Sequence, residues 1–217
     1  MRSFILILFA LVFGATLQAE TLSPSRTIDS HGVVSMQDPS IRIDLPINAQ
    51  YIGSTRWNLF DVADAEIYMF VEADANKKIQ RYYWIQFEAY LPSAPDYFYE
   101  YKNGTNEIIS NLDFNLRARF GPTAKTPKPG SDLEHAFKLI TDAGYTLPRD
   151  LMNVRFVHLT DATKRKELMV IYAEDLALAG LSSTDFISDG KINAKWAPVE
   201  AKLIERARQS IAFYPTK

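Results

Sequence analysis

The strongest constraint on the fold is a pair of neighbouring segments in which apolar side chains recur at every second position. Residues 66–73 place Ile67, Met69, Val71 and Ala73 on one face of an extended chain. Residues 79–91 place Ile79, Tyr83, Ile85, Phe87, Ala89 and Leu91 on one face, with Arg81 as the exception. A period of two is typical of strands, and Asp74 to Lys78 supply turn chemistry between the two runs. The pattern predicts a long antiparallel hairpin.

Further strands follow from the same period. We expect them at 41–45, 51–60, 112–120, 151–159 and 167–173. Residues 97–101 also look extended, and the Asn103-Gly104 pair that follows favours a hairpin turn because both residues tolerate positive φ. A helix over 106–114 competes with the strand interpretation, but the alternation through 112–120 favours strand. Residues 20–37 are polar and predict a loosely held arm.

Two helices are expected late in the chain. Ser131 and Glu134 form a capping box, and Gly144 is placed to end the helix that they begin. A second amphipathic helix is predicted from Pro198 to about residue 213. The fold class is therefore α+β, with a curved, mainly antiparallel sheet or a partial barrel and two packed helices. We expect one domain over 20–217, with the proline-rich segment 121–130 as the alternative internal boundary.

The first nineteen residues have the layout of a cleavable signal peptide. Arg2 gives a positive start, residues 4–13 are an unbroken apolar run, and Ala19 precedes the expected cut before Glu20. Ten apolar residues are too few for a helix that spans a membrane, which needs about 20. The sequence predicts a periplasmic or secreted protein with no stable membrane insertion after cleavage.

Composition and motifs narrow the functional classes. The net charge is −2, and no compact basic face suggests a nucleic-acid partner. His31, His135 and His158 are scattered, and the chain has no cysteine, so neither a metal site nor a cofactor is expected. The sequence contains no G-x-S-x-G and no glycine-rich phosphate loop. These absences favour a protein that is not an enzyme, and they leave any catalytic residues unknown.

The most unusual feature is aromatic. Side chains from one side of strand 79–91 mix rings with polar groups, and the preceding strand adds another ring; the predicted ligand-binding set is Tyr68, Tyr82, Trp84, Glu88 and Tyr90. Flat rings with a few orienting polar groups are typical of small-molecule or sugar sites. The alternative is that these rings form a second core layer covered by the C-terminal helix.

Three functional hypotheses follow from these observations. The first is an exported binding module for an apolar or aromatic small ligand. The second is an envelope protein that assembles with a protein partner through exposed aromatics or a free sheet edge. The third is a hydrolase that uses Glu72 and Glu88, which the alternation places on one side of the sheet.

Overall fold

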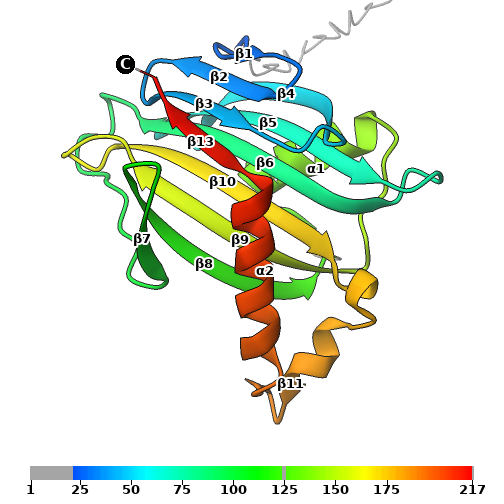
Figure 1. Cartoon of the computed structure of the whole chain (residues 1–217). Helices are drawn as coiled ribbons and strands as arrows, with labels where there is room; N and C mark the ends of the chain where they lie inside the picture. Colours follow the sequence, from blue (N-terminus) through cyan, green and yellow to red (C-terminus); the bar gives the residue numbers. More distant parts are fainter. Residues whose placement is uncertain (1–21, 124–125, 217) are drawn as a thin grey trace, which may run out of the picture.

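The computed structural model describes residues 22–123 and 126–216, so the predicted signal peptide, 1–19, lies outside the described residues. Seven strands form one curved antiparallel sheet in the order β4-β5-β6-β10-β9-β8-β7 (Figure 1). Their bounds are β4 Gln50–Leu59, β5 Ala63–Ala73, β6 Ile79–Tyr90, β7 Thr105–Ile109, β8 Leu112–Pro122, β9 Asp150–Leu159 and β10 Lys166–Asp175. Strands on both sides of the proline-rich segment 121–130 pair with each other in this sheet.

A second sheet joins the two ends of the described chain. Its order is β1-β2-β3-β13, with bounds β1 Thr27–Ile28, β2 Gly32–Met36, β3 Ser40–Asp44 and β13 Ala212–Pro215. The expected loose arm over 20–37 is therefore wrong for the part that the structure describes. Residues 32–36 form a strand because Val33 inserts into the core, and it is fully buried.

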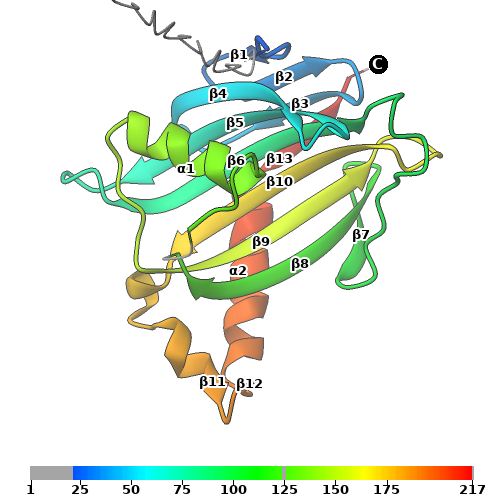
Figure 2. The ribbon, with the colours of Figure 1, turned by 180° about the vertical axis from the view of Figure 1, so that it is seen from behind.

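Both predicted helices are present. Helix α1 covers Asp132–Asp142, and the side chain of Ser131 caps its first turn by accepting the Glu134 N–H. Helix α2 covers Trp196–Ser210. Before α2, the 3₁₀ turns η1 (Leu176–Ala179) and η2 (Ser183–Phe186) lead to a small hairpin, β11 (Ile187–Ser188) and β12 (Lys191–Ile192). This hairpin lies at the far end of α2 from the small sheet (Figure 2).

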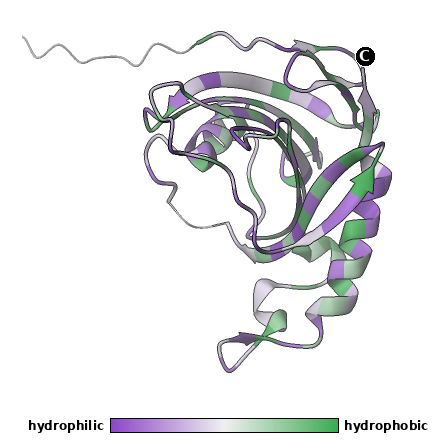
Figure 3. Cartoon of the chain, turned by 90° about the vertical axis from the view of Figure 1, so that its left-hand side faces the viewer, coloured by the Kyte–Doolittle hydropathy of each residue, from purple (hydrophilic) through white to green (hydrophobic). Residues whose placement is uncertain are grey.

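The two helices cover opposite faces of the large sheet, which we name by them. On the α2 face, rings and aliphatic side chains pack against α2 and the small sheet; they include Tyr83, Phe87, Phe114, Val154, Phe156, Leu203 and Phe213. On the α1 face, Ile67, Met69, Tyr82, Trp84, Ala136 and Ile140 share a second core cluster. The side view in Figure 3 shows the curvature of the sheet between these layers. The expected curved antiparallel α+β architecture is confirmed.

The segment after β6 differs from the sequence prediction. Residues 97–101 are irregular, and Asn103 and Gly104 do not form the turn of a hairpin. The turn is instead made by Ser110 and Asn111, whose φ angles of 50° and 64° join β7 to β8. The helix considered over 106–114 is likewise absent, because these residues belong to β7, the turn and β8. Residues 97–101 leave the sheet and send Tyr99 and Tyr101 over buried acids described below.

Candidate functional site

Four of the five predicted ligand-binding residues share the α1 face. Tyr82, Trp84, Glu88 and Tyr90 alternate along β6 on this side, and Tyr90 stacks on Tyr99 with ring centroids 4.4 Å apart. The side chains of Tyr82 and Trp84 are only 6% and 4% exposed, and they lie in the core cluster on the α1 side of the sheet. The helix over this face is therefore α1, where the core alternative had expected the C-terminal helix.

Tyr68 does not belong to this group. In the β5–β6 register, Met69 lies opposite Trp84 and Tyr68 lies opposite Ile85, so Tyr68 points to the α2 face. Its hydroxyl hydrogen-bonds to the Glu66 carboxylate and to the Arg26 backbone. The expectation that Tyr68 shares a cleft with Tyr82 and Trp84 is wrong. In the β5–β6 pairing, odd-numbered residues of β5 lie on the same face as even-numbered residues of β6.

The same phase shift separates Glu72 from Glu88. Glu72 lies on the α2 face and accepts hydrogen bonds from Tyr83 Oη at 2.6 Å and from Arg81 Nη1 at 3.0 Å. Glu88 lies on the α1 face and accepts from Tyr99 Oη at 2.7 Å. Because the sheet separates the two carboxylates, they cannot act together on one substrate, and the pair expected for a hydrolase is wrong.

Tyr82 and Trp84 line one wall of a cavity of about 380 Å³ between the sheet and the start of α1. Met169 and Ile171 of β10 and Leu133 of α1 add apolar surface. The rest of the lining is polar: Arg117, Arg119, Ser131, Asp132, Asn153 and Arg155. A volume of this size falls within the range of small-molecule sites, and the cavity combines a flat aromatic and aliphatic wall with a largely charged one.

The three arginines of this cavity lie on adjacent positions of β8 and β9. Arg117 is directly opposite Arg155 in the strand register, and Arg119 is two residues further on the same face of β8. Among the described residues, none of their guanidinium groups has a carboxylate within ion-pair distance. Arg155 Nε is buried and has no hydrogen-bond partner there. The cavity therefore gathers three guanidinium groups, none of which forms an ion pair with a carboxylate in the described part of the protein.

The pKa of Arg119 reflects the closeness of the other two arginines. Burial, together with the neighbouring Arg117 and Arg155 guanidinium groups, lowers the pKa of Arg119. Like charges placed directly opposite each other on two strands destabilise a sheet. An arginine guanidinium binds carboxylate, sulfate or phosphate with two parallel hydrogen bonds. An anion in the cavity would thus remove the repulsion between these side chains and satisfy their donors.

A hydrogen-bonded chain links the cavity wall to a buried acid. Trp84 Nε1 donates to Gln86 Oε1 at 2.8 Å, and Gln86 Nε2 donates to Glu88 Oε2 at 2.7 Å. Tyr99 Oη closes the chain on the other oxygen of Glu88. Gln86 is fully buried, so each of these bonds forms in a medium of low dielectric constant. The network holds the Trp84 indole in one orientation at the wall of the cavity.

Glu88 has a second acid for a neighbour. Glu167 of β10 is its direct partner across the strand pair and accepts a hydrogen bond from the hydroxyl of Tyr101. Burial raises the pKa of Glu88 to about 7, with the charge of Asp132 adding to the effect. Burial and the charge of Glu88 raise the pKa of Glu167 to about 8, and burial also raises the pKa of Asp132. Glu88 and Glu167 therefore carry less negative charge at neutral pH than ordinary glutamates, which weakens their neutralisation of the arginines beside them.

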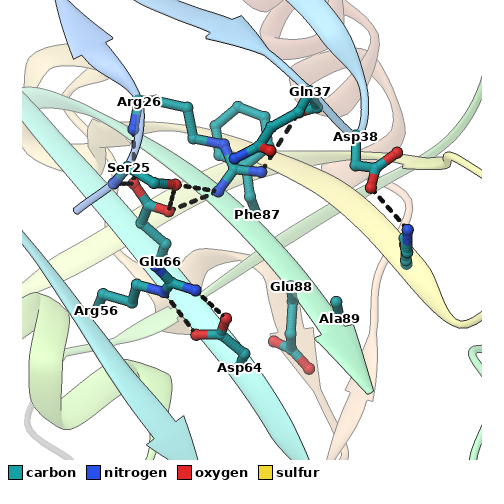
Figure 4. A pocket seen from close by; sticks show the side chains of 11 residues that line it. Ser25, Arg26, Gln37, Asp38, Arg56, Asp64, Glu66, Phe87, Glu88 and Ala89 are labelled. Atoms are coloured by element: carbon teal, nitrogen blue, oxygen red, sulfur yellow. Dashed lines mark hydrogen bonds and ion pairs between the residues drawn. The ribbon is translucent and has the colours of Figure 1, made fainter. Parts of the chain in front are cut away.

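A smaller cavity on the other side of the sheet shows the contrast. It has a volume of about 170 Å³, and its charged lining residues other than Glu88 are arranged in pairs, drawn close up in Figure 4. Arg26 pairs with Glu66 at 2.5 Å, Arg56 with Asp64 at 2.5 Å and Lys166 with Asp38 at 2.6 Å. Each arginine and lysine of this cavity is thus already paired with a carboxylate within the protein, so the cavity offers an incoming anion no unpaired cation.

His135 and His158 have separate surroundings in the structure. His135 stacks on Trp57 with centroids 4.1 Å apart, and the His158 ring contacts the backbone oxygen of Asp113 at 3.0 Å. Within residues 22–123 and 126–216, no group of three or more His, Asp or Glu side chains is arranged to hold a metal ion.

In the same described part of the chain, no helix has the length and apolarity needed to cross a membrane.

The sequence interpretation missed the arginines and Glu167. Arg117 and Arg119 alternate with Leu116, Ala118 and Phe120, which identifies their face of β8 but not its partner. Arg155 lies 36 positions beyond Arg119 in the sequence, and only the β8–β9 register brings the groups together. The only sequence signal was that one face of this strand carries arginines and the other carries apolar side chains. A strand with one face in solvent gives the same pattern.

Comparison with known proteins found no match to a family model, to a curated protein or to a solved structure.

Proposed function

We propose that this chain is an exported binding module for a small molecule that presents a flat apolar face and an anionic group. The observation that carries the proposal is the cluster of Arg117, Arg119 and Arg155 around a cavity walled by Tyr82 and Trp84. Export is proposed from the N-terminal signal-peptide pattern, which lies outside the described residues. The binding hypothesis from the sequence is thereby extended: the ligand carries a negative charge as well as an apolar surface.

The charge of the whole molecule does not supply this preference. The chain has a net charge of −2, so a small anion is not attracted by the protein as a whole. Attraction must come from the local field of the three guanidinium groups, which the low-dielectric walls of a cavity concentrate. Apolar contacts then add affinity, at roughly 25 cal/mol for each Å² of apolar surface removed from water.

The proposal is tested by isothermal titration calorimetry on residues 20–217 at low salt. The probe is naphthalene-2-sulfonate, and uncharged 2-naphthol is the matched ligand. We expect the sulfonate to bind at 1:1 stoichiometry and 2-naphthol to bind at least about tenfold more weakly, because a hydrogen bond to a charged group contributes about 1.5–3 kcal/mol.

Two variants separate the site from general surface charge. Arg117→Gln should weaken sulfonate binding at least about tenfold. Lys202→Gln, an exposed residue of α2 on the other side of the sheet, removes the same charge and should leave the affinity unchanged. Trp84→Ala is a poorer probe because Trp84 is only 4% exposed, so its loss also removes core packing. Equal affinity of wild type and Arg117→Gln would refute the site.

A further inference from the structure

A second cavity lies on the α1 face beside the arginine cavity. Its volume is about 490 Å³, and it lies between the irregular segment around residues 99–102 and the first halves of β7 and β8. Asp113 and Asn115 of β8 and Val157 and Leu159 of β9 line it. These residues have the same strand phase as Arg117 and Arg155, so both cavities open on one face of the sheet.

The two cavities are consecutive along the same two strands. Asn115 pairs with Val157, and the next pair on that face is Arg117 with Arg155. Lining residues of β8 run from Asp113 to Arg119, a strip about 20 Å long at the rise of an extended strand.

A contact between Tyr101 and Arg155 links the linings of the two cavities. Tyr101 lines the second cavity, and its ring lies 4.7 Å from the guanidinium carbon of Arg155, which lines the first. Tyr101 belongs to an irregular segment and not to the sheet. A ligand that passes over this ring would therefore contact both compartments with little change in the strands beneath it.

The chemistry of the second cavity is different from that of the first. Its Lys102 pairs with Glu100 at 3.2 Å, and Asn115 Nδ2 donates to Asn106 Oδ1 at 2.9 Å. Asn106 is exposed, so its amide N–H groups face solvent. Amides, tyrosine rings and charges of both signs suit neutral hydroxyl groups, which both donate and accept hydrogen bonds. The arginine compartment suits a carboxylate or sulfate.

We propose that the two cavities form one groove for an acidic oligosaccharide, with an acidic sugar among Arg117, Arg119 and Arg155 and the next sugar at Asn106 and Asn115. The proposal rests on the proposed function and names its ligand class. A sugar ring offers an apolar face for the Tyr82 and Trp84 wall, hydroxyl groups for the amides and, in a uronate, a carboxylate for the arginines.

The test compares galacturonate, its α-1,4-linked trimer and the uncharged trimer maltotriose by calorimetry on residues 20–217. We expect the acidic trimer to bind at least about tenfold tighter than the monomer, and maltotriose to bind more weakly than the acidic trimer. Asn106→Ala should weaken trimer binding about threefold to tenfold, the loss of one hydrogen bond, and leave monomer binding unchanged. Asn58→Ala, an exposed amide on β4 at the opposite edge of the sheet, should change neither.

The outcomes distinguish this proposal from the one on which it rests. Trimer and monomer of equal affinity would overturn the shared groove and leave the arginine site intact. Binding of naphthalene-2-sulfonate without binding of either galacturonate probe would overturn the acidic-sugar class. Maltotriose binding as tightly as the acidic trimer would also overturn it. Failure of both naphthalene-2-sulfonate and galacturonate would overturn the proposed function itself.

Discussion

Glu88 and Glu167 face each other directly across the β6–β10 strand pair, and each accepts a hydrogen bond from a tyrosine hydroxyl rather than from a cation. Their exposed fractions are 9% and 4%. The other charged and titratable groups that act on them are Asp132 of α1, Arg155 of β9 and the tyrosines themselves. Two acids in such a site are stable in the fold only while at least one of them is protonated.

This pair predicts a stability that falls as pH rises. An unfolded glutamate has a pKa of about 4.3, whereas burial raises the pKa of Glu88 to about 7 and that of Glu167 to about 8. Between these limits the folded state holds protons that the unfolded state has released, so the contribution is complete below about pH 4 and is lost as pH rises through 7 and 8. Glu167→Gln should make the fall in unfolding free energy shallower by about 1.4 kcal/mol per pH unit.

Urea titrations at pH 5.5 and pH 7.5 measure this difference. Glu205→Gln is the control, because Glu205 is exposed on α2 and its side chain is 57% accessible. The control should keep the wild-type dependence on pH. If Glu167→Gln keeps it as well, the acid pair is not protonated in the folded state, and the neutral environment assigned to it is incorrect.

The arginine cluster predicts a variant that gains stability while it loses binding. Arg117 lies directly opposite Arg155, and a like-charged cross-strand pair destabilises a sheet by roughly 0.2–1 kcal/mol. Arg117→Gln should therefore raise the free energy of unfolding of the ligand-free protein by about 0.5 kcal/mol at low salt. The gain should shrink at 1 M salt, where charges are screened within about 3 Å. A loss of stability would show that Arg117 has a structural role.

The backbone of Gly32 leaves no room for a side chain, so a substitution there should strongly destabilise the small sheet. A Cβ at this position would lie 2.1 Å from the backbone oxygen of Ile43, and the φ angle of +152° is one that other residues rarely adopt. Gly32→Ala should lower the free energy of unfolding by more than about 2 kcal/mol, since the strand pair β2–β3 must separate to accept it. Gly121→Ala is the matched control, because a Cβ there meets nothing within 4 Å. Urea unfolding of both variants compares them directly.

Arg26 holds the first described residues against the large sheet. Its guanidinium pairs with Glu66 at 2.5 Å and lies 4.0 Å from the centre of the Phe87 ring. Glu66 is only 2% exposed, so Arg26→Ala leaves a buried carboxylate with fewer partners. We expect the free energy of unfolding to fall by about 1–3 kcal/mol.

The exposed pair of Lys138 and Asp142 is the comparison for Arg26. Lys138→Ala should lower the free energy of unfolding by under about 0.5 kcal/mol, because both groups are largely in water. Combining Arg26→Ala with Glu66→Gln should recover part of the loss in a double-mutant cycle. Strictly additive effects would show that the two side chains are not coupled.

The fold was predictable where local pattern and burial agree. The β5–β6 and β9–β10 hairpins follow from alternating side chains and short polar turns, and the Ser131 cap marks the start of α1. The turn after β7 was not predictable in this way. Ser110 and Asn111 adopt positive φ although Asn103 and Gly104 have the stronger preference for it. Residues 97–101, whose Tyr99 and Tyr101 hydroxyls bond buried acids, are not a strand, so Asn103 and Gly104 have no preceding strand to join to β7.

The site was predictable only in part for the same reason. The alternation identified Tyr82, Trp84, Glu88 and Tyr90 as one face of β6, since this is a property of a single strand. Whether Tyr68 or Met69 joins that face depends on the register of two strands, and a shift of one residue reverses the answer. The meeting of Arg117 with Arg155 likewise depends on the pairing of β8 with β9.

The pairing of β3 with β13 has a consequence for how the molecule folds. Ile41 lies opposite Pro215, so β3 completes its backbone hydrogen bonds only when a segment far away in the sequence reaches it. Until then, one edge of β3 lacks a partner, and Phe213 is missing from the interior between the two sheets. Closing the small sheet therefore depends on a contact between residues far apart in the sequence, and the loop-closure entropy of such a contact makes it slow to form.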